Sequence, residues 1–298
     1  MALPQMPHNG LSQSPGIQTI QGVLEWGCSE LSFLSADEAR NEMEWILCEV
    51  LGINQSVLFL EYANRIDFKF FEKIKKIIGR RCKREPLAYI LGRAPFYEEC
   101  LSVSPDCLIP RPETEILVEH FLQASGFTST DTFCFLDLGT GSGAIALSLL
   151  RKFPNAKATL SDISERALAV AQKNLRAYGL TSRAEFICSN YFEALRERQW
   201  QAIISNPPYL SAKDFEALQS EISFEPHLSI WGGLDGLDFY RRLSVELSDH
   251  LKPDGFFALE MGQGQAEAVK KLFEDQNFSG LQIVTDYAGI QRVLSGKK

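Results

Sequence analysis

Apolar residues in the first third of the chain recur at helical spacing. Behind Ser35 and Glu38, which form a capping-box pattern, apolar side chains return every three or four positions until Gly52, a residue type that often ends a helix. The segment from Phe70 to Ile78 repeats the same period. We therefore predict a bundle of roughly four or five short helices and assign residues 20–94 to an N-terminal helical domain.

The pattern changes at Pro95. Residues 95–109, PFYEECLSVSPDCLI, are rich in turn formers and in residues that favour strands. We expect a short hairpin or an extended linker there, followed by a second, larger domain over residues 110–298.

In that second domain, apolar runs that predict buried strands alternate with amphipathic segments that predict helices. Strands are expected at 132–139, 157–162, 184–188, 202–205, 255–261, 281–286 and 291–296. Such alternation is typical of an α/β domain with a mostly parallel sheet. The last two strands are separated only by a short turn, which predicts an antiparallel strand on the edge of the sheet.

Composition and charge narrow the class of protein. The chain has 298 residues, of which 45% are hydrophobic and 23% charged, as is ordinary for a globular protein with one large or two modest domains. Its formal net charge of −8 disfavours broad binding to a phosphate backbone. No apolar run approaches the ~20 residues of a membrane span. We therefore expect no nucleic-acid partner and no membrane contact, and we expect a monomer.

The cysteines and the N-terminus bear on the compartment. Seven cysteines are scattered without a C-x-x-C pattern or a Cys/His cluster, so we interpret them as free thiols in a reducing cytoplasm and expect no metal. The first residues lack the charged and apolar regions of a secretory signal. We interpret residues 1–19 as a flexible leader.

A glycine-rich turn is the first candidate binding site. In FLDLGTGSGAIAL, the residues Gly139, Thr140, Gly141, Ser142 and Gly143 connect a predicted strand to a predicted helix. Glycine lets a ligand approach the backbone closely, and ligands of open α/β sheets bind at this edge. Asp162 ends the next strand, where a carboxylate can hold ribose hydroxyls. The pattern predicts an adenosine-containing cofactor, which leaves both NAD and S-adenosyl-L-methionine open.

Two features favour S-adenosyl-L-methionine. Asp137 begins the loop, and its carboxylate suits the ammonium group of a methionine moiety better than a pyrophosphate. The paired strands at the end of the chain are also absent from the six-stranded parallel dinucleotide-binding domain.

The stretch SNPPYL, residues 205–210, is the second candidate site. Its two prolines form a stiff corner at the end of a predicted strand and hold Asn206 and Tyr209 there. The Asn206 side-chain oxygen and the Pro207 carbonyl can accept the two N–H bonds of a planar nitrogen group, and Tyr209 can form a flat wall beside it. This arrangement predicts methyl transfer to an amide or exocyclic amine by positioning and desolvation, with Asn206, Pro207 and Tyr209 as catalytic residues.

These motifs together resemble the HemK/PrmC family, the protein-(glutamine-N5) methyltransferases that modify peptide-chain release factors. The resemblance rests on REPLAYILG (84–92), PFY (95–97), SVSPDCLIPRPETE (102–115), LDLGTGSGAIAL (136–147), SNPPYL (205–210) and GGLDGLDFYRRL (232–243). The Asn-Pro-Pro-Tyr motif alone is shared with DNA adenine and some RNA guanine methyltransferases. IPRPETE behind a helical N-terminal domain is far more specific.

The resemblance implies a fold and an activity. The fold is that of a class I S-adenosylmethionine-dependent methyltransferase, a Rossmann-like, mostly parallel sheet of seven strands with an antiparallel edge strand. A small all-α domain that docks the protein substrate precedes it. The activity is methylation of the glutamine in the Gly-Gly-Gln loop of class I peptide-chain release factors, which act in translation termination.

The resemblance also implies residue roles. The loop from Gly139 to Gly143 cradles the methionine part of the cofactor, and Asp162 holds its ribose. Asn190 and Tyr191 stand beside the adenine, where the family often has Asp and Trp. The segment from Asn206 to Tyr209, including Pro208, binds the target amide, and Asn206 also contributes to the cofactor site. Phe96 and the Arg111–Pro112 pair help to wall the site.

Several interpretations remain open beside this one. Residues 69–84, KFFEKIKKIIGRRCKR, hold eight Lys and Arg against one Glu and are either a docking face for an acidic partner or a solvated helix face. Glu260, at the end of a strand, is either a support for the site or a cap. The alternative functions are a DNA adenine-N6 or RNA guanine-N2 methyltransferase, a non-catalytic adaptor and an NAD oxidoreductase.

Overall fold

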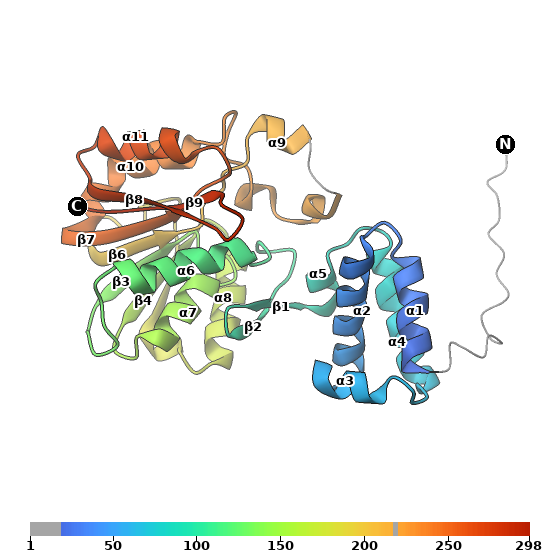
Figure 1. Cartoon of the computed structure of the whole chain (residues 1–298). Coiled ribbons are helices and arrows are strands. Elements are labelled where there is room, and N and C mark those ends of the chain that lie inside the picture. The colour runs from blue at the N-terminus through green and yellow to red at the C-terminus, as the bar shows by residue number, and fades with distance from the viewer. Residues whose placement is uncertain (1–18, 217–219) are drawn as a thin grey trace. The chain divides into compact units, whose positions relative to one another are not determined.

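The computed structural model describes residues 19–216 and 220–298. The predicted leader therefore lies almost wholly outside the described residues. The chain forms two compact units, one up to Leu91 and one from Gly92 to Lys298 (Figure 1).

The first unit is a bundle of helices. They are α1 (Ile20–Glu30), α2 (Ala36–Leu51), α3 (Gln55–Glu61), α4 (Phe68–Arg81) and the short α5 (Leu87–Leu91). The capping box predicted before α2 is present, because the Ser35 hydroxyl accepts from the backbone N–H of Glu38 and the Glu38 carboxylate accepts from that of Ser35. Gly52 ends α2 in the left-handed conformation, as its position predicted. The helices meet around buried aliphatic side chains that include Ile46, Leu47, Leu58, Ile74 and Ile78.

The second unit begins with a hairpin of β1 (Arg93–Phe96) and β2 (Glu99–Ser102), paired antiparallel. The Asn174 side chain ties this hairpin to the rest of the unit. Its oxygen accepts from the Ser102 N–H at 2.7 Å, and its nitrogen donates to the Ser102 carbonyl at 2.9 Å and to the Ser142 carbonyl at 2.8 Å. The hairpin is thus anchored to the glycine loop through one buried amide.

Seven strands of the described part of the chain form the central sheet of this unit. They are β3 (Cys134–Leu138), β4 (Lys157–Asp162), β5 (Ala184–Cys188), β6 (Trp200–Ser205), β7 (Leu251–Glu260), β8 (Ser279–Thr285) and β9 (Gln291–Lys297). Their order is β5-β4-β3-β6-β7-β9-β8, and the pairs from β5 through β7 are parallel. The sequence thus predicted the strands and the parallel core correctly.

One detail of the predicted topology is corrected. β9 is antiparallel to both neighbours and lies between β7 and β8, so the antiparallel strand is second from the edge and β8 is the edge strand. Burial explains the choice, because four consecutive residues of β9, Val293 to Gly296, are buried, whereas β8 is exposed or half-buried along its length.

Helices cover both faces of the sheet (Figure 1). Helices α6 (Pro112–Ala124), α7 (Ala144–Lys152) and α8 (Glu165–Ala177) pack on one face, and α10 (Asp238–His250) and α11 (Ala266–Glu274) pack on the other. Neighbouring residues of β3 alternate between the two cores, with Phe135 in the first and Leu136 in the second, as the two-residue period of a strand requires. The short α9 (Ala212–Glu216) follows the Asn-Pro-Pro-Tyr corner.

In the described residues, no single helix has both the length and the apolar character needed to cross a bilayer. Helices α2 and α3 meet those criteria only when they are taken together across a 90° bend.

Candidate active site

Three adjacent strands end at the same edge of the sheet and bring the predicted motifs together. Asp137 of β3 lies opposite Ile204 of β6, and Ser205 lies opposite Leu259 of β7. The Ser205 hydroxyl donates to the Leu138 carbonyl at 2.6 Å, which fixes the end of β6 to the start of the glycine loop. The glycine loop, the Asn-Pro-Pro-Tyr corner and Glu260 therefore lie side by side at the carboxyl ends of the strands.

The glycine loop has the conformation that its sequence predicted. Gly139 and Gly141 have φ angles of 74° and 54°, in the left-handed region that favours glycine. A Cβ atom built on either residue would meet nothing within 4 Å, so both glycines border open space. The backbone N–H groups of Gly139 and Thr140 both donate to the Ser161 carbonyl, at 2.8 and 2.9 Å, and hold the loop against β4. The open space at Gly139 and Gly141 fits a cofactor that approaches the backbone closely.

Gly143 has a different task from the other two glycines. Its φ angle is 81°, and a Cβ atom here would lie 3.1 Å from Ala171 Cβ and 3.1 Å from Leu175 Cδ1 on α8. This glycine therefore allows α7 and α8 to pack closely, and it does not border the open space beside Gly141.

Asp137 is fully buried beneath the loop. Its Oδ2 accepts from the Thr140 hydroxyl at 2.7 Å and from the Ala146 N–H at 3.1 Å, so it caps the start of α7. Its Oδ1 is buried without a hydrogen-bond partner among the described residues. Burial raises the pKa of this carboxyl to about 7. An unsatisfied buried carboxylate oxygen suits a cationic donor, so this observation fits the ammonium group of S-adenosylmethionine, reached directly or through water.

Asp162 closes the other side of the loop. Its Oδ2 accepts from the Gly141 N–H and its Oδ1 from the Ser164 N–H, both at 2.9 Å, and burial raises its pKa. The carboxylate therefore shapes the glycine loop directly. Each oxygen keeps a second lone pair, which can accept from a ribose hydroxyl.

Asn190 and Tyr191 lie just after β5. The Asn190 amide nitrogen donates to Glu193 at 2.8 Å, which leaves its oxygen as the acceptor. The Tyr191 ring packs on α10, with its centroid 4.7 Å from that of Phe239 and 4.1 Å from the Arg242 guanidinium carbon. Glu193 therefore orients the Asn190 side chain, and residues of α10 orient the Tyr191 ring.

At the Asn-Pro-Pro-Tyr corner, the side chains of Asn206 and Tyr209 are both held by hydrogen bonds. Asn206 Nδ2 donates to the Thr114 hydroxyl at 2.8 Å, and the Tyr209 hydroxyl donates to Glu260 at 3.2 Å. Burial is the main cause that raises the pKa of Tyr209, so its hydroxyl stays protonated. The Asn206 amide therefore turns its nitrogen toward α6 and leaves its oxygen free of that contact.

A small cavity of about 120 Å³ opens at this corner. It is lined by Leu108, Arg111, Asn206, Pro207, Tyr209, Leu210, Ile222, Ser229 and Ile230. Arg111, which precedes α6, pairs with Glu225, a buried residue whose pKa is raised by that burial. The lining combines apolar walls with the two predicted amide acceptors.

Phe96 is not part of that cavity. Its side chain is 1% exposed and belongs to the core on the α6–α8 face of the sheet, so the structure gives this residue a packing role. The short motif PFY did not reveal which face of its strand would be buried.

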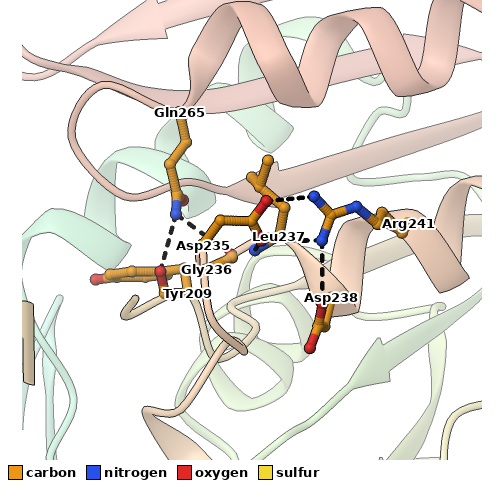
Figure 2. A network of polar contacts seen from close by, with 7 residues as sticks. All are labelled: Tyr209, Asp235, Gly236, Leu237, Asp238, Arg241 and Gln265. Atoms are coloured by element: carbon orange, nitrogen blue, oxygen red, sulfur yellow. Dashed lines mark hydrogen bonds and ion pairs between the residues drawn. The ribbon is translucent and has the colours of Figure 1, made fainter. Parts of the chain in front are cut away.

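The loop 232–237 supports the corner from behind. A Cβ atom on Gly232 would lie 2.8 Å from Tyr209 Cα, and one on Gly236 would lie 2.4 Å from the Tyr209 carbonyl oxygen. The Gln265 amide nitrogen donates to that carbonyl at 2.9 Å and to the Gly236 carbonyl at 3.3 Å (Figure 2). Arg241 pairs with Asp235 and Asp238 and holds the loop against the first turn of α10.

Sequence reasoning missed two residues of this site. Thr114 lies in IPRPETE and contacts Asn206 across 92 positions, and Gln265 contacts Tyr209 across 56. The motif IPRPETE marked the region of Thr114, but nothing in the sequence indicated that Thr114 contacts Asn206. Glu260, whose role the sequence left open, is a support of the site, since its carboxylate accepts from both Thr114 and Tyr209.

Comparisons with known proteins bear on the family and the fold. Residues 22–92 match the PrmC N-terminal domain, and residues 112–223 match the methyltransferase small domain. Among solved structures, a methyltransferase from Pyrococcus furiosus superposes with a TM-score of 0.50 at 22% identity, over 66% of this chain and 88% of that one, which supports the fold alone.

Curated relatives cover nearly the whole chain. The release factor glutamine methyltransferase of Geobacter sulfurreducens is 36% identical over 96% of this chain and 99% of its own length. That of Koribacter versatilis is 35% identical over 94% of this chain and 99% of its own. The protein therefore belongs to the release factor glutamine methyltransferase family.

Proposed function

We propose that this protein transfers a methyl group from S-adenosyl-L-methionine to the side-chain amide nitrogen of the glutamine in the Gly-Gly-Gln loop of class I release factors. The observation that carries the proposal is the pair of acceptors at the Asn-Pro-Pro-Tyr corner, next to a cavity and to the glycine loop. The reaction takes place in the cytoplasm, where translation factors act, with the protein as a monomer and without direct contact to nucleic acid.

The chemistry explains why two acceptors are needed. An amide nitrogen is a poor nucleophile because its lone pair is delocalised into the carbonyl group. The Asn206 oxygen and the Pro207 carbonyl accept the two N–H bonds of the substrate amide, so the face of the nitrogen points toward the methyl donor. Tyr209 and the apolar walls exclude water. Positioning of this kind is worth several orders of magnitude in rate without a strong base.

The residues present fit the cofactor. Gly139 and Gly141 leave open space beside the backbone, Asp137 offers an unsatisfied buried oxygen, and Asp162 offers lone pairs for ribose hydroxyls. When bound, S-adenosylmethionine supplies an electrophilic methyl group on a sulfonium. Asn190 and Tyr191 would hold its adenine.

The helical unit docks the protein substrate through α4. Lys73, Lys75 and Lys76 are exposed and face solvent from that helix. Arg81 belongs to the same basic stretch, but it is 4% exposed and pairs with Glu42, so it supports the fold of this unit. The lysines attract an acidic surface of the partner and mainly speed its encounter.

The test is methyl transfer from labelled S-adenosylmethionine to a purified release factor. We expect stoichiometric labelling of the intact factor and none after its loop glutamine is replaced by alanine. Asn206→Ala should reduce the single-turnover rate by ~10²–10³, because a preorganised polar contact is lost. Asn206→Asp, which keeps an acceptor, should retain more activity. Labelling of DNA or RNA instead of the release factor would overturn the proposal in favour of a nucleic-acid substrate, and a release factor labelled equally without its glutamine would overturn it as well.

A further inference from the structure

A buried chain of hydrogen bonds runs from β7 to the amide of Asn206. The Thr114 hydroxyl donates to Glu260 Oε2 at 2.6 Å, and Asn206 Nδ2 donates to Thr114 Oγ1 at 2.8 Å. Thr114 is 3% exposed and Glu260 is fully buried. The three residues come from α6, from the end of β7 and from the loop after β6, so separate parts of the fold converge on one amide.

We propose that Thr114 and Glu260 are positioning residues that fix which way the Asn206 amide faces. This inference rests on the proposed function and adds to it the reason why the amide oxygen, and not the nitrogen, meets the substrate. A primary amide has nearly the same shape in its two flipped orientations, so packing alone does not distinguish them. The direction of the hydrogen bonds distinguishes the two orientations.

The direction follows from the inventory of donors and acceptors. An ionised carboxylate only accepts, so Thr114 must turn its single O–H toward Glu260. Its oxygen then offers only lone pairs to Asn206, and only the amide nitrogen can fill that contact. The amide oxygen of this cavity-lining residue is left as the acceptor, and it can accept an N–H of the substrate. With the opposite flip, two acceptor oxygens would face each other in a buried place.

The same carboxylate also holds the second member of the corner. Glu260 Oε1 accepts from the Tyr209 hydroxyl at 3.2 Å, and the backbone carbonyl of Glu260 accepts from the Tyr240 hydroxyl at 2.7 Å. One buried group therefore orients both Asn206 and Tyr209. A neutral residue could satisfy Thr114 with less desolvation cost, but a neutral amide or hydroxyl can also donate, and the direction of the chain would be lost.

The test compares Thr114→Val, which removes the hydroxyl at constant shape, with Thr114→Ser, which keeps it. In the productive orientation Thr114→Val leaves the Asn206 nitrogen without a partner, so the single-turnover rate should fall ~5–100-fold with unchanged affinity for S-adenosylhomocysteine. Thr114→Ser should stay within about threefold of the parent. Thr159→Val is the matched control. The buried Thr159 hydroxyl accepts from Trp200, which lies at the start of β6, at the opposite end of that strand from Asn206. Loss of this hydroxyl should leave the rate unchanged.

A double-mutant cycle separates positioning from mere stability. If Thr114 acts through Asn206, Thr114→Val should cost nothing further once Asn206 is alanine. Equal rate losses from Thr114→Val in both backgrounds, or a rate for Thr114→Val equal to that of the parent, would overturn the inference while leaving the proposed function intact. A parent protein that does not label the release factor would overturn the proposed function itself.

A second measurement needs no substrate. In protein labelled with ¹⁵N-asparagine, the Asn206 side-chain N–H resonances should exchange slowly with solvent in the parent and in Thr114→Ser, and at least tenfold faster in Thr114→Val. The Asn206→Ala variant identifies these resonances. Equal exchange in the parent and in Thr114→Val would show that the hydroxyl does not hold the amide.

Discussion

Two glycines of the loop offer a matched pair of substitutions, because they share a backbone conformation and differ in what lies beside them. Gly141 and Gly143 both have positive φ angles, 54° and 81°, so replacement by alanine should cost each about 1–2 kcal/mol in backbone strain. The new methyl group meets open space at Gly141, whereas at Gly143 it lies 3.1 Å from two carbon atoms of α8. Ordinary carbon contacts are about 3.5–4.0 Å, so α7 or α8 must move.

The magnitudes follow from that difference. Overpacking of this kind costs about 1–3 kcal/mol, so Gly143→Ala should lose about 2–5 kcal/mol in all and Gly141→Ala only about 1–2. For a unit of this size each kcal/mol lowers the Tm by about 2–4 °C. Cofactor affinity should behave in the opposite way. If the open space beside Gly141 holds the cofactor, one methyl group there should weaken binding by ~5–100-fold, while Gly143→Ala should change it less than about threefold.

Scanning calorimetry measures the stability of the two variants, and titration calorimetry with S-adenosylhomocysteine measures their affinity. The reasoning fails at the loop if Gly141→Ala binds this product as tightly as the parent. It fails at the helix pair if Gly143→Ala unfolds at the same temperature as Gly141→Ala.

Three further predictions concern other parts of the protein. Asp162→Ala, which removes the acceptor for the Gly141 N–H, should weaken S-adenosylmethionine and S-adenosylhomocysteine alike by about 1.5–3 kcal/mol, and calorimetry showing unchanged affinities would contradict this. Replacement of the exposed Lys75 and Lys76 by Glu should raise the apparent KM for the release factor about tenfold in low salt, with cofactor affinity unchanged. The same charge reversal at the exposed Lys173 serves as the control. A KM equal to that of the parent would show that Lys75 and Lys76 belong to a solvated helix face. The third prediction concerns pH. Burial raises the pKa of Glu260 to about 7, and the charge of Glu113 adds to the rise. The hydrogen bonds from Thr114 and Tyr209 and the charge of Arg292 lower the pKa. Tyr240 also faces this residue, and its hydroxyl donates to the backbone oxygen of Glu260. Because the folded state then holds this proton more tightly than the unfolded one, stability should fall between pH 4.5 and about 7, while the methyl-transfer rate rises as the carboxylate forms. Glu260→Gln should flatten the rate profile and reduce the loss of stability, while the part due to Asp137, whose pKa burial also raises to about 7, should stay. Profiles identical to those of the parent would assign them to another group.

Regular elements were predictable from the sequence because burial imposes a period on it. The apolar run around Phe135 and Leu136 marks a strand covered on both faces, and the capping box at Ser35 marks the start of a helix. The position of β9 between β7 and β8 was not predicted, because a short turn requires only that the two strands it joins be antiparallel to each other. Which of them meets β7 depends on which face can be buried, and Val293 and Leu294 are fully buried in β9.

The site was predictable where its chemistry is local in sequence and obscure where it is not. The open space at Gly141 and the corner after β6 follow from short motifs. Phe96 was assigned to the wall because it lies in such a motif, but the side of a strand that is buried depends on neighbours far away in the chain. Thr114 reaches Glu260 across 146 positions, and no local pattern encodes that contact.

The stiffness of the Asn-Pro-Pro-Tyr corner does not come from its prolines alone. They fix two backbone angles, but they set neither the place of the segment nor the direction of its side chains. The place is set by Gly236 and Gln265, which leave no room between loop 232–237 and the Tyr209 carbonyl (Figure 2). The direction is set by Glu260 through Thr114. Because catalysis by positioning loses orders of magnitude when a group moves by about an ångström, residues that never touch the substrate are expected to influence the rate as strongly as some that do.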